Sequence, residues 1–254
     1  MEPTIRRLIR TRYSPWSERA AWVLDHHGLA YEAVEHVPFI GERRLRKIVG
    51  PEKKRVSVPV LIAGDEKLTE SWDIALYADR EGKGPKLIPL EQKDEIRRWN
   101  DLADEVMAAG RVLVLRGILA NPQALDEGLP PSFPRLLRPL LRPVGRRAMH
   151  WFARKYEARL EDAPAQQARV RAGLTTLRAA LAKSSPYLLG TFSYADIVMA
   201  TGLQGVSPVD GSYIRLGPAT RKAWTQEEIA AEFPDLIEWR NQLYERHRGE
   251  RSRV

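Results

Sequence analysis

The chain has 254 residues, of which 43% are hydrophobic, a content typical of a globular protein with a sizeable core rather than of a disordered chain. It contains no cysteine, which excludes disulfides, zinc–thiolate sites, iron–sulfur clusters and redox relays between protein thiols. No apolar run approaches the roughly 20 residues of a membrane span, and the first residues lack the apolar core of a secretory signal. We therefore expect a cytoplasmic protein without membrane insertion.

In the N-terminal third, short apolar runs alternate with one clear helical pattern. Residues 5–13 indicate a strand, and a proline early in the next segment with a glycine at its end predicts a helix from Trp16 to Gly28. Residues 31–37 alternate as a second strand does. A β-branched run at 58–62, a Gly64-Asp65 turn and a short strand at 67–69 predict a hairpin, and a helix follows over 71–80.

Beyond residue 89 the pattern changes to long helices. Apolar residues recur at three- and four-residue steps over 96–106 and again over 170–181. Ser193 and Asp196 have the spacing of a capping box at the start of a further helix. Residues 205–222 are rich in glycine and proline and indicate a loop, and 233–247 indicate a final amphipathic helix. The change of pattern predicts two domains, 1–84 and 92–254, joined by a linker over 85–91.

The net charge of +8 is concentrated in residues 129–160, where eight basic residues stand against one acidic residue, Glu157. Pro139 and Pro143 argue against a straight helix here, although the leucines and valine share one helical face: Leu136, Leu137, Leu140, Leu141 and Val144. Contact with a membrane surface or a nucleic acid is one interpretation of such a stretch. We favour a solvated helix that lines a substrate cleft, and we expect no nucleic-acid partner.

Four short motifs stand at the joints between these elements. Ser14-Pro15-Trp16-Ser17 lies where the thioredoxin fold keeps its Cys-x-x-Cys, and Val58-Pro59 lies where that fold keeps a cis-proline. Glu70-Ser71 opens the next helix, and the 193–196 box opens a helix in the second domain. In this order and spacing the motifs resemble the soluble glutathione transferases over nearly the whole chain. The stretch from residue 12 to residue 19 is similar to the active site of their serine- and cysteine-type branch, as in the omega and zeta classes.

The resemblance implies a fold class, a co-substrate and an assembly. The fold would be an α/β thioredoxin-like N-terminal domain followed by an all-α helical C-terminal domain. Glutathione would bind to the first domain, a small-molecule electrophile would lie against the second, and the protein would be a homodimer. Adjacent histidines such as His26 and His27 point in different directions on a helix, so we expect no metal.

Ser14 is the predicted catalytic residue, since a hydroxyl at a helix N-terminus can donate a hydrogen bond to a thiolate that the helix dipole also stabilises. Lowering a thiol pKa by two units from ~8.5 takes about 2.7 kcal/mol of differential stabilisation. The family's nucleophile is the sulfur of glutathione, so Ser14 would assist rather than attack. The alternative is that Ser14 and Ser17 merely cap the helix, and Tyr13 is a second candidate donor.

The remaining predicted glutathione contacts are Trp16, Ser17, Val58, Pro59, Glu70 and Ser71. A cis Val58–Pro59 bond would turn the Val58 backbone outward to pair with a peptide, and free amides at the start of a helix favour a carboxylate. The resemblance leaves the basic residue that meets the glycyl carboxylate open among Arg44, Lys54 and Arg55.

Two functions remain open on the sequence. The first is a glutathione transferase that activates the glutathione thiolate for attack on a hydrophobic electrophile. The second is a non-catalytic protein of the same fold that binds apolar ligands or serves as an interaction module. Glutathione-dependent disulfide reduction through a protein thiol is excluded because the chain has no cysteine.

Overall fold

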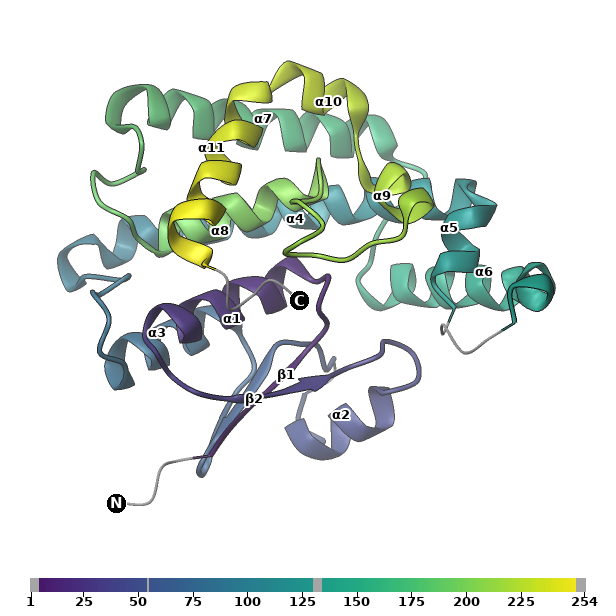
Figure 1. The fold of residues 1–254 in the computed structure, drawn as a ribbon, viewed down its shortest axis with the longest axis horizontal. Coiled ribbons are helices and arrows are strands. Elements are labelled where there is room, and N and C mark those ends of the chain that lie inside the picture. Colours follow the sequence, from purple (N-terminus) through teal and green to yellow (C-terminus); the bar gives the residue numbers. More distant parts are fainter. Residues whose placement is uncertain (1–4, 54, 130–133, 250–254) are drawn as a thin grey trace.

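The computed structural model describes residues 5–53, 55–129 and 134–249. The N-terminal domain contains strands β1 (Arg6–Arg10), β2 (Glu32–Glu35), β3 (Val60–Ala63) and β4 (Glu66–Leu68) and helices α1 (Pro15–His26), α2 (Glu42–Val49) and α3 (Ser71–Glu81). The helices that follow are α4 (Lys93–Ala120), α5 (Pro122–Glu127), α6 (Arg138–Lys155), α7 (Ala163–Ser184), α8 (Tyr194–Gly202), α9 (Pro218–Trp224), α10 (Glu227–Glu232) and α11 (Pro234–Leu243). A small sheet with helices, followed by a helical domain, confirms the predicted fold class (Figure 1).

The sheet has the strand order β2-β1-β3-β4. β1 runs parallel to β2, with Leu8 opposite Ala33, and antiparallel to β3, with Leu8 opposite Leu61. A parallel pair needs a crossover, and α1 supplies it between β1 and β2. β3 and β4 form the predicted hairpin. The first strand therefore ends beside the start of α1, in the centre of the sheet.

The sheet is covered by helices on both faces, because successive strand residues point in opposite directions. Leu8 belongs to the large core shared with α1 and α3, and the next residue, Ile9, packs in a second cluster with Leu45 of α2. In Figure 1, α1 lies between the sheet and the helical domain, and α2 lies on the far side of the strands. Helix α2 was not predicted from the sequence. Leu45 is its one buried residue, so few of its positions belong to the core.

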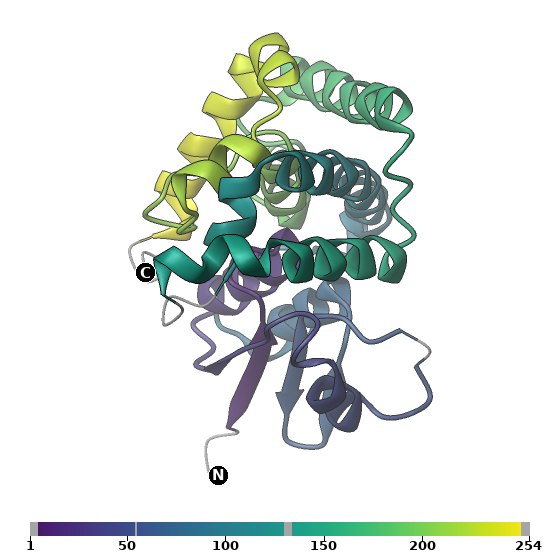
Figure 2. The ribbon, with the colours of Figure 1, turned by 90° about the vertical axis from the view of Figure 1, so that its right-hand side faces the viewer.

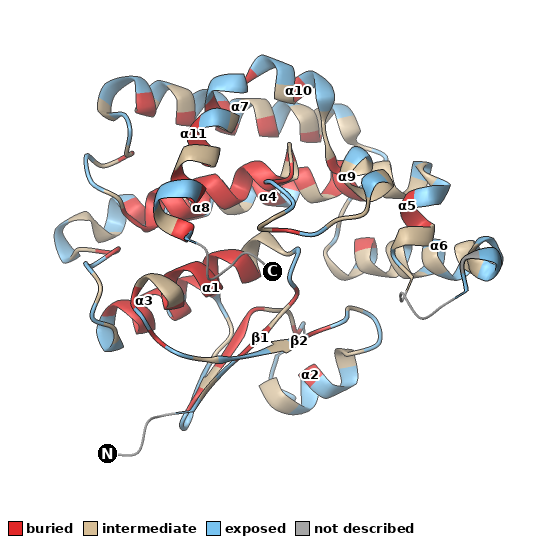
Figure 3. Ribbon diagram, viewed as in Figure 1, coloured by how far each residue is buried: buried red, intermediate tan, exposed pale blue. Residues whose placement is uncertain are grey.

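The helical domain is built around α4, which packs against α7 and α8, and every residue of α8 is buried, as its red ribbon in Figure 3 shows. The capping box is present: the Asp196 carboxylate accepts hydrogen bonds from the amides of Ser193 and Leu188, both at 2.9 Å. The prediction of a loop over 205–222 is wrong at its end, because α9 begins at Pro218, a residue suited to a first helical turn. The predicted C-terminal helix is present as α11 with a π-helical turn, Tyr244–Arg248.

Buried polar contacts join the two domains. Arg19 of α1 is fully buried and donates to Asn100 at 3.2 Å and to Asp104 at 3.0 Å, both on α4. Arg248, near the end of the described chain, pairs with the carboxylate of Glu18 at 2.8 Å. Removing one partner of such a buried ion pair leaves the other charge uncompensated, which costs about 3–5 kcal/mol. These contacts fix the position of α1 against the helical domain.

Candidate active site

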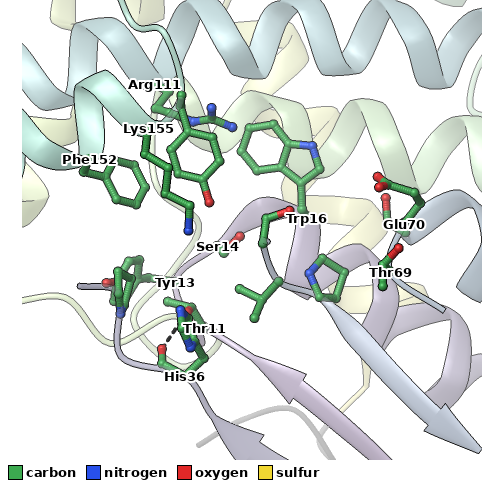
Figure 4. A pocket seen from close by; sticks show the side chains of 16 residues that line it. Thr11, Tyr13, Ser14, Trp16, His36, Thr69, Glu70, Arg111, Phe152 and Lys155 are labelled. Atoms are coloured by element: carbon green, nitrogen blue, oxygen red, sulfur yellow. Dashed lines mark hydrogen bonds between the residues drawn. The ribbon is translucent and has the colours of Figure 1, made fainter. Parts of the chain in front are cut away.

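A cavity of about 180 Å³ opens between the two domains (Figure 4). From the N-terminal domain it is lined at the end of β1 and start of α1, in the loop after β2, around residues 57–59 and at the start of α3. The helical domain supplies Arg111 of α4 together with Phe152, Lys155 and Tyr156 at the end of α6. Six of the seven predicted site residues line this one cavity: Ser14, Trp16, Val58, Pro59, Glu70 and Ser71.

Ser14 occupies the N-cap position of α1 in an extended conformation, with φ −79° and ψ 123°. Its hydroxyl makes no capping hydrogen bond to the amides of the helix, while its backbone amide donates to the Thr11 carbonyl at 2.9 Å. The first N–H groups of a helix lack intrahelical partners and carry partial positive charge. The Ser14 hydroxyl therefore stands free at a point of the cavity where a negative charge is favoured.

Trp16 is held in place by the helical domain. Its indole N–H donates to Oδ1 of Asp104 at 2.9 Å, and the same oxygen accepts from Arg19 at 3.0 Å. The second oxygen of Asp104 accepts from the side-chain amide of Asn100 at 3.2 Å. Asp104 thus orients the Trp16 side chain as a wall of the cavity.

The Val58–Pro59 peptide bond is cis, as predicted, and both residues line the cavity. Glu70 is the N-cap residue of α3, and Ser71 is the first residue of that helix. Lys53 lies 3.4 Å from the Glu70 carboxylate and donates to the Thr69 hydroxyl. The cavity therefore combines the segment that leads into β3 with the start of α3, where the first amides of the helix lack intrahelical partners.

Ser17 does not line the cavity. It is 1% exposed, and its hydroxyl accepts a hydrogen bond from the Thr11 amide at 3.2 Å. The first turn of α1 directs the Ser17 side chain inward, away from the cavity that the other predicted glutathione contacts line. Its bond ties the end of β1 to α1 rather than capping the helix.

Tyr13 is a second hydroxyl on the cavity wall, and its ring meets Trp224 edge-on at 6.2 Å. Burial, together with the nearby carboxylate of Glu35, raises the pKa of Tyr13 to about 12. The phenol therefore keeps its proton at neutral pH and can only donate or accept a hydrogen bond as the neutral group.

Two of the three basic residues predicted to meet a carboxylate, Arg44 and Arg55, do not line the cavity. Arg44 is exposed on α2, and Arg55 is exposed and pairs with Glu157. Lys54 lies outside the described residues. Two other cations do line the cavity, Lys155 and Arg111, and sequence reasoning identified neither of them.

Lys155 is anchored at the start of α2. Its ammonium group lies 2.8 Å from both oxygens of the Glu42 carboxylate, and His36 approaches the same carboxylate at 3.4 Å. Burial lowers the pKa of His36. At neutral pH the pair of Lys155 and Glu42 therefore links α6 to α2 across the domain boundary, and the ammonium retains one face toward the cavity.

The guanidinium of Arg111 lies over two aromatic rings. Its guanidinium carbon lies 4.3 Å from the ring centre of Trp16 and 4.2 Å from that of Tyr156. Burial lowers the pKa of Arg111 to about 10, so the group remains a cation at neutral pH. Among the described residues, none forms an ion pair or a hydrogen bond with Arg111.

Helix α6 lies within the basic stretch of residues 129–160. The helix continues through Pro143, and Pro139 lies in its first turn, so the prolines do not break it as the sequence suggested. Figure 2 shows α6 running between the N-terminal domain and the other helices. Its last turns line the cavity with Phe152 and Lys155, as predicted, while Leu140 nearer its start is exposed.

No helix in the described part of the chain combines the length and apolarity that crossing a membrane requires. The described residues also contain no group of three or more histidine, aspartate or glutamate side chains close enough to hold a metal ion. His26 and His27 have separate partners, the Pro85 carbonyl at 3.0 Å and the Asp79 carboxylate at 2.7 Å.

Two family models match the chain. Residues 8–86 match the N-terminal domain of glutathione S-transferases, and residues 123–242 match the C-terminal domain of the same family. Together these matches include every residue that lines the cavity except Arg111, which lies between the two matched ranges.

The chain is also similar to individual proteins of this family. Probable glutathione S-transferases from Nicotiana tabacum and Solanum tuberosum are 30% and 31% identical over 99 and 105 residues, which is 38% and 41% of this chain. The match spans less than half of each relative, 43% and 47%. A glutathione S-transferase from Methylobacillus flagellatus with glutathione bound has a TM-score of 0.61 at 20% identity, covering 95% of both chains. A tau-class enzyme from Mangifera indica has a TM-score of 0.59 at 18% identity, covering 98% of this chain and 93% of its own.

Proposed function

The chain belongs to the glutathione S-transferase family, and we propose that it is a serine-type glutathione transferase whose Ser14 stabilises the glutathione thiolate. One observation carries the proposal: the Ser14 hydroxyl makes no capping hydrogen bond at the N-cap of α1, and Ser14 lines the same cavity as the cis Val58–Pro59 segment. A hydrogen bond from a neutral hydroxyl to a thiolate is charge-assisted and about twice as strong as one between neutral groups.

Glutathione is a peptide with a carboxylate at each end, and the cavity has a matching feature for each part. The backbone of Val58 pairs with the cysteinyl unit, as in the family. The free amides at the start of α3, at Glu70 and Ser71, receive the γ-glutamyl carboxylate, and the Glu70 side chain meets the amine. These contacts place the sulfur at the start of α1, beside Ser14.

We assign the glycyl carboxylate to Lys155 rather than to Arg44, Lys54 or Arg55. Lys155, at the end of α6, lines the cavity and contacts Glu42 at the start of α2, whereas Arg44 and Arg55 are exposed to solvent. An ammonium group is a point charge with three donors, so it can bind a second carboxylate while it stays beside Glu42. The helical domain then completes the peptide site.

The chemistry needs no metal. Bound glutathione gives up its thiol proton to solvent. The Ser14 hydroxyl keeps its proton and donates a hydrogen bond to the resulting thiolate. The sulfur forms a bond to an electrophilic carbon of the second substrate, and the leaving group departs with its electron pair. Phe152, Trp16 and Tyr156 form an apolar wall beside the sulfur, which favours a hydrophobic electrophile.

Calorimetric titration of the full chain with glutathione tests the binding step, and turnover of 1-chloro-2,4-dinitrobenzene with glutathione tests the reaction. We expect saturable binding and turnover, with turnover reduced about 10-fold in Ser14→Ala at neutral pH. Absence of glutathione binding would overturn the proposal. Binding without turnover of any electrophile in a panel would favour the non-catalytic alternative, an apolar-ligand or interaction protein.

A further inference from the structure

We propose that the second substrate carries a carboxylate or an equivalent anion, and that the N–H edge of Arg111 binds it. The inference rests on the proposed transferase function and specifies its substrate class: a flat, apolar electrophile with a negative charge at one end. Arg111 is then a specificity-determining residue in the wall that the helical domain contributes.

The aromatic contacts of Arg111 use none of its N–H groups in a hydrogen bond to the described residues, so these donors are available to a ligand. Trp16 covers one face of the guanidinium at 4.3 Å, and Tyr156 lies over the group at 4.2 Å. Aromatic rings attract a guanidinium through its face and leave the N–H groups in the plane unbonded. A planar fork of N–H donors fits a carboxylate with two parallel hydrogen bonds. Since Arg111 lines the cavity, a ligand in the cavity is the group this edge can reach.

Arg111 has no carboxylate counter-ion among the described residues. Arg240, which is buried, also lacks one, but it donates hydrogen bonds to the Ser207 carbonyl and the Asn241 side chain, whereas Arg111 donates none to the described residues. Arg19, Arg248 and Lys155 each pair with a carboxylate at 3.0 Å or less. Asp104 is the nearby acid that favours the charged form of Arg111, but both its oxygens already accept hydrogen bonds. Removing a cation from water without a partner is costly, so an anionic ligand gains most at this position.

The two carboxylates of glutathione lie elsewhere in the proposed arrangement. One meets the start of α3 at Glu70 and Ser71, and the other meets Lys155 beside Glu42. In Figure 4 the Trp16 ring is drawn between Arg111 and Glu70. Arg111 therefore belongs to the part of the cavity that the second substrate occupies.

The walls around Arg111 indicate the rest of the ligand. Trp16, Tyr156 and Phe152 are aromatic, and the rings of Phe152 and Tyr156 lie 4.7 Å apart. Aromatic side chains provide stacking surfaces for a flat group. An aryl or conjugated acid combines this surface with the anion, which makes it the class that fits best.

The test uses two probes that differ only at one end, 4-chloro-3-nitrobenzoate and 4-chloro-3-nitrobenzamide. In both, the sulfur bonds to the ring carbon and chloride leaves, and each rate is divided by the uncatalysed rate with glutathione. For the wild type we expect the normalised kcat/KM of the benzoate to exceed that of the benzamide on the order of 10-fold or more.

In Arg111→Gln the ratio of the two normalised kcat/KM values should fall to near unity, mainly because the value for the benzoate decreases. The matched control is Arg97→Gln, on the same helix: Arg97 also stacks on a tryptophan, Trp72 at 4.9 Å, but it pairs with Asp101 and does not line the cavity. Arg97→Gln should keep the wild-type preference. Calorimetry with the two corresponding glutathione conjugates gives the same comparison without turnover.

Three outcomes decide the question. If the wild type prefers the benzoate and only Arg111→Gln loses that preference, the inference holds. If glutathione binds and both probes turn over without a carboxylate preference, or if Arg111→Gln slows both probes equally, the inference is wrong and the transferase function stands. If the wild type does not bind glutathione, the proposed function itself falls.

Discussion

The two serines at the start of α1 should respond in opposite ways to loss of their hydroxyls. Ser14 makes no bond within the helix, so Ser14→Ala should leave the free energy of unfolding almost unchanged. It removes one charge-assisted hydrogen bond to the thiolate, worth about 1.5–3 kcal/mol, which corresponds to about 1–2 units in the pKa of bound glutathione. We therefore expect the thiol pKa in the binary complex to rise by one unit or more.

Ser17→Ala should do the reverse. The Thr11 amide, which is buried, loses its 3.2 Å hydrogen bond to the Ser17 hydroxyl and is left without that partner. An unsatisfied buried amide costs about 1–3 kcal/mol. At about 2–4 °C per kcal/mol for a chain of this size, the Tm should fall by roughly 2–12 °C. The thiol pKa should stay at its wild-type value.

Ultraviolet titration of the thiolate in each binary complex measures the pKa, and thermal unfolding of the same samples measures stability. The crossed result, with a pKa change in one variant and a Tm change in the other, supports the assignment. If Ser17→Ala moved the pKa and Ser14→Ala did not, the two roles would be reversed. If neither moved it and Tyr13→Phe did, the phenol would be the donor and the serine-type mechanism would be refuted.

Three further outcomes follow from the structure. Burial raises the pKa of Asp79, but hydrogen bonds from His27 and two backbone amides outweigh burial and lower that pKa overall. The ionised Asp79 carboxylate therefore stabilises the fold above pH ~3.8, and this stabilisation is lost on further acidification. Denaturant titrations at several pH values should show Asp79→Asn less stable than wild type at pH 7, with the difference shrinking toward pH 3. Lys155→Gln should weaken glutathione about 10-fold by calorimetry and leave γ-glutamylcysteine, which lacks the glycyl carboxylate, unaffected; equal losses would contradict our assignment. Light scattering at micromolar concentration should give the mass of a homodimer, and a stable monomer mass would contradict the dimer that the family resemblance implies.

Much of the fold was predictable because its signals are local. The helix from Pro15 ends near Gly28, whose φ of 64° suits the residue that terminates a helix. Turn residues and the spacing of apolar residues likewise predict the hairpin, the long helices α4 and α7 and the capping box of α8. Helix α2 was missed because it is short and charged, although Leu45, Ile48 and Val49 follow helical spacing.

The predictability of the site residues also depends on whether their signal is local in the sequence. Ser14, Val58, Pro59 and Glu70 belong to short motifs at element joints, so their spacing along the chain is itself informative. Lys155 and Arg111 reach the cavity only through the packing of the helical domain on the first, and most charged residues on helices face solvent. A signal for Arg111 was present: it is a lone charge in an apolar run from residue 106 to residue 115.

One face of α4 explains how these distant residues act together. Asn100, Asp104 and Arg111 are four and seven residues apart, and at about 100° per residue all three fall within roughly 40° of one another around the helix. Asp104 holds the indole N–H of Trp16, and Arg111 stacks on the ring of the same side chain. The helix that binds Trp16 and Arg19 of α1 through its polar side chains therefore also carries Arg111. In the proposed arrangement a rigid element connects the sulfur site with the guanidinium, so their separation would select substrates by the distance from the electrophilic carbon to the anion.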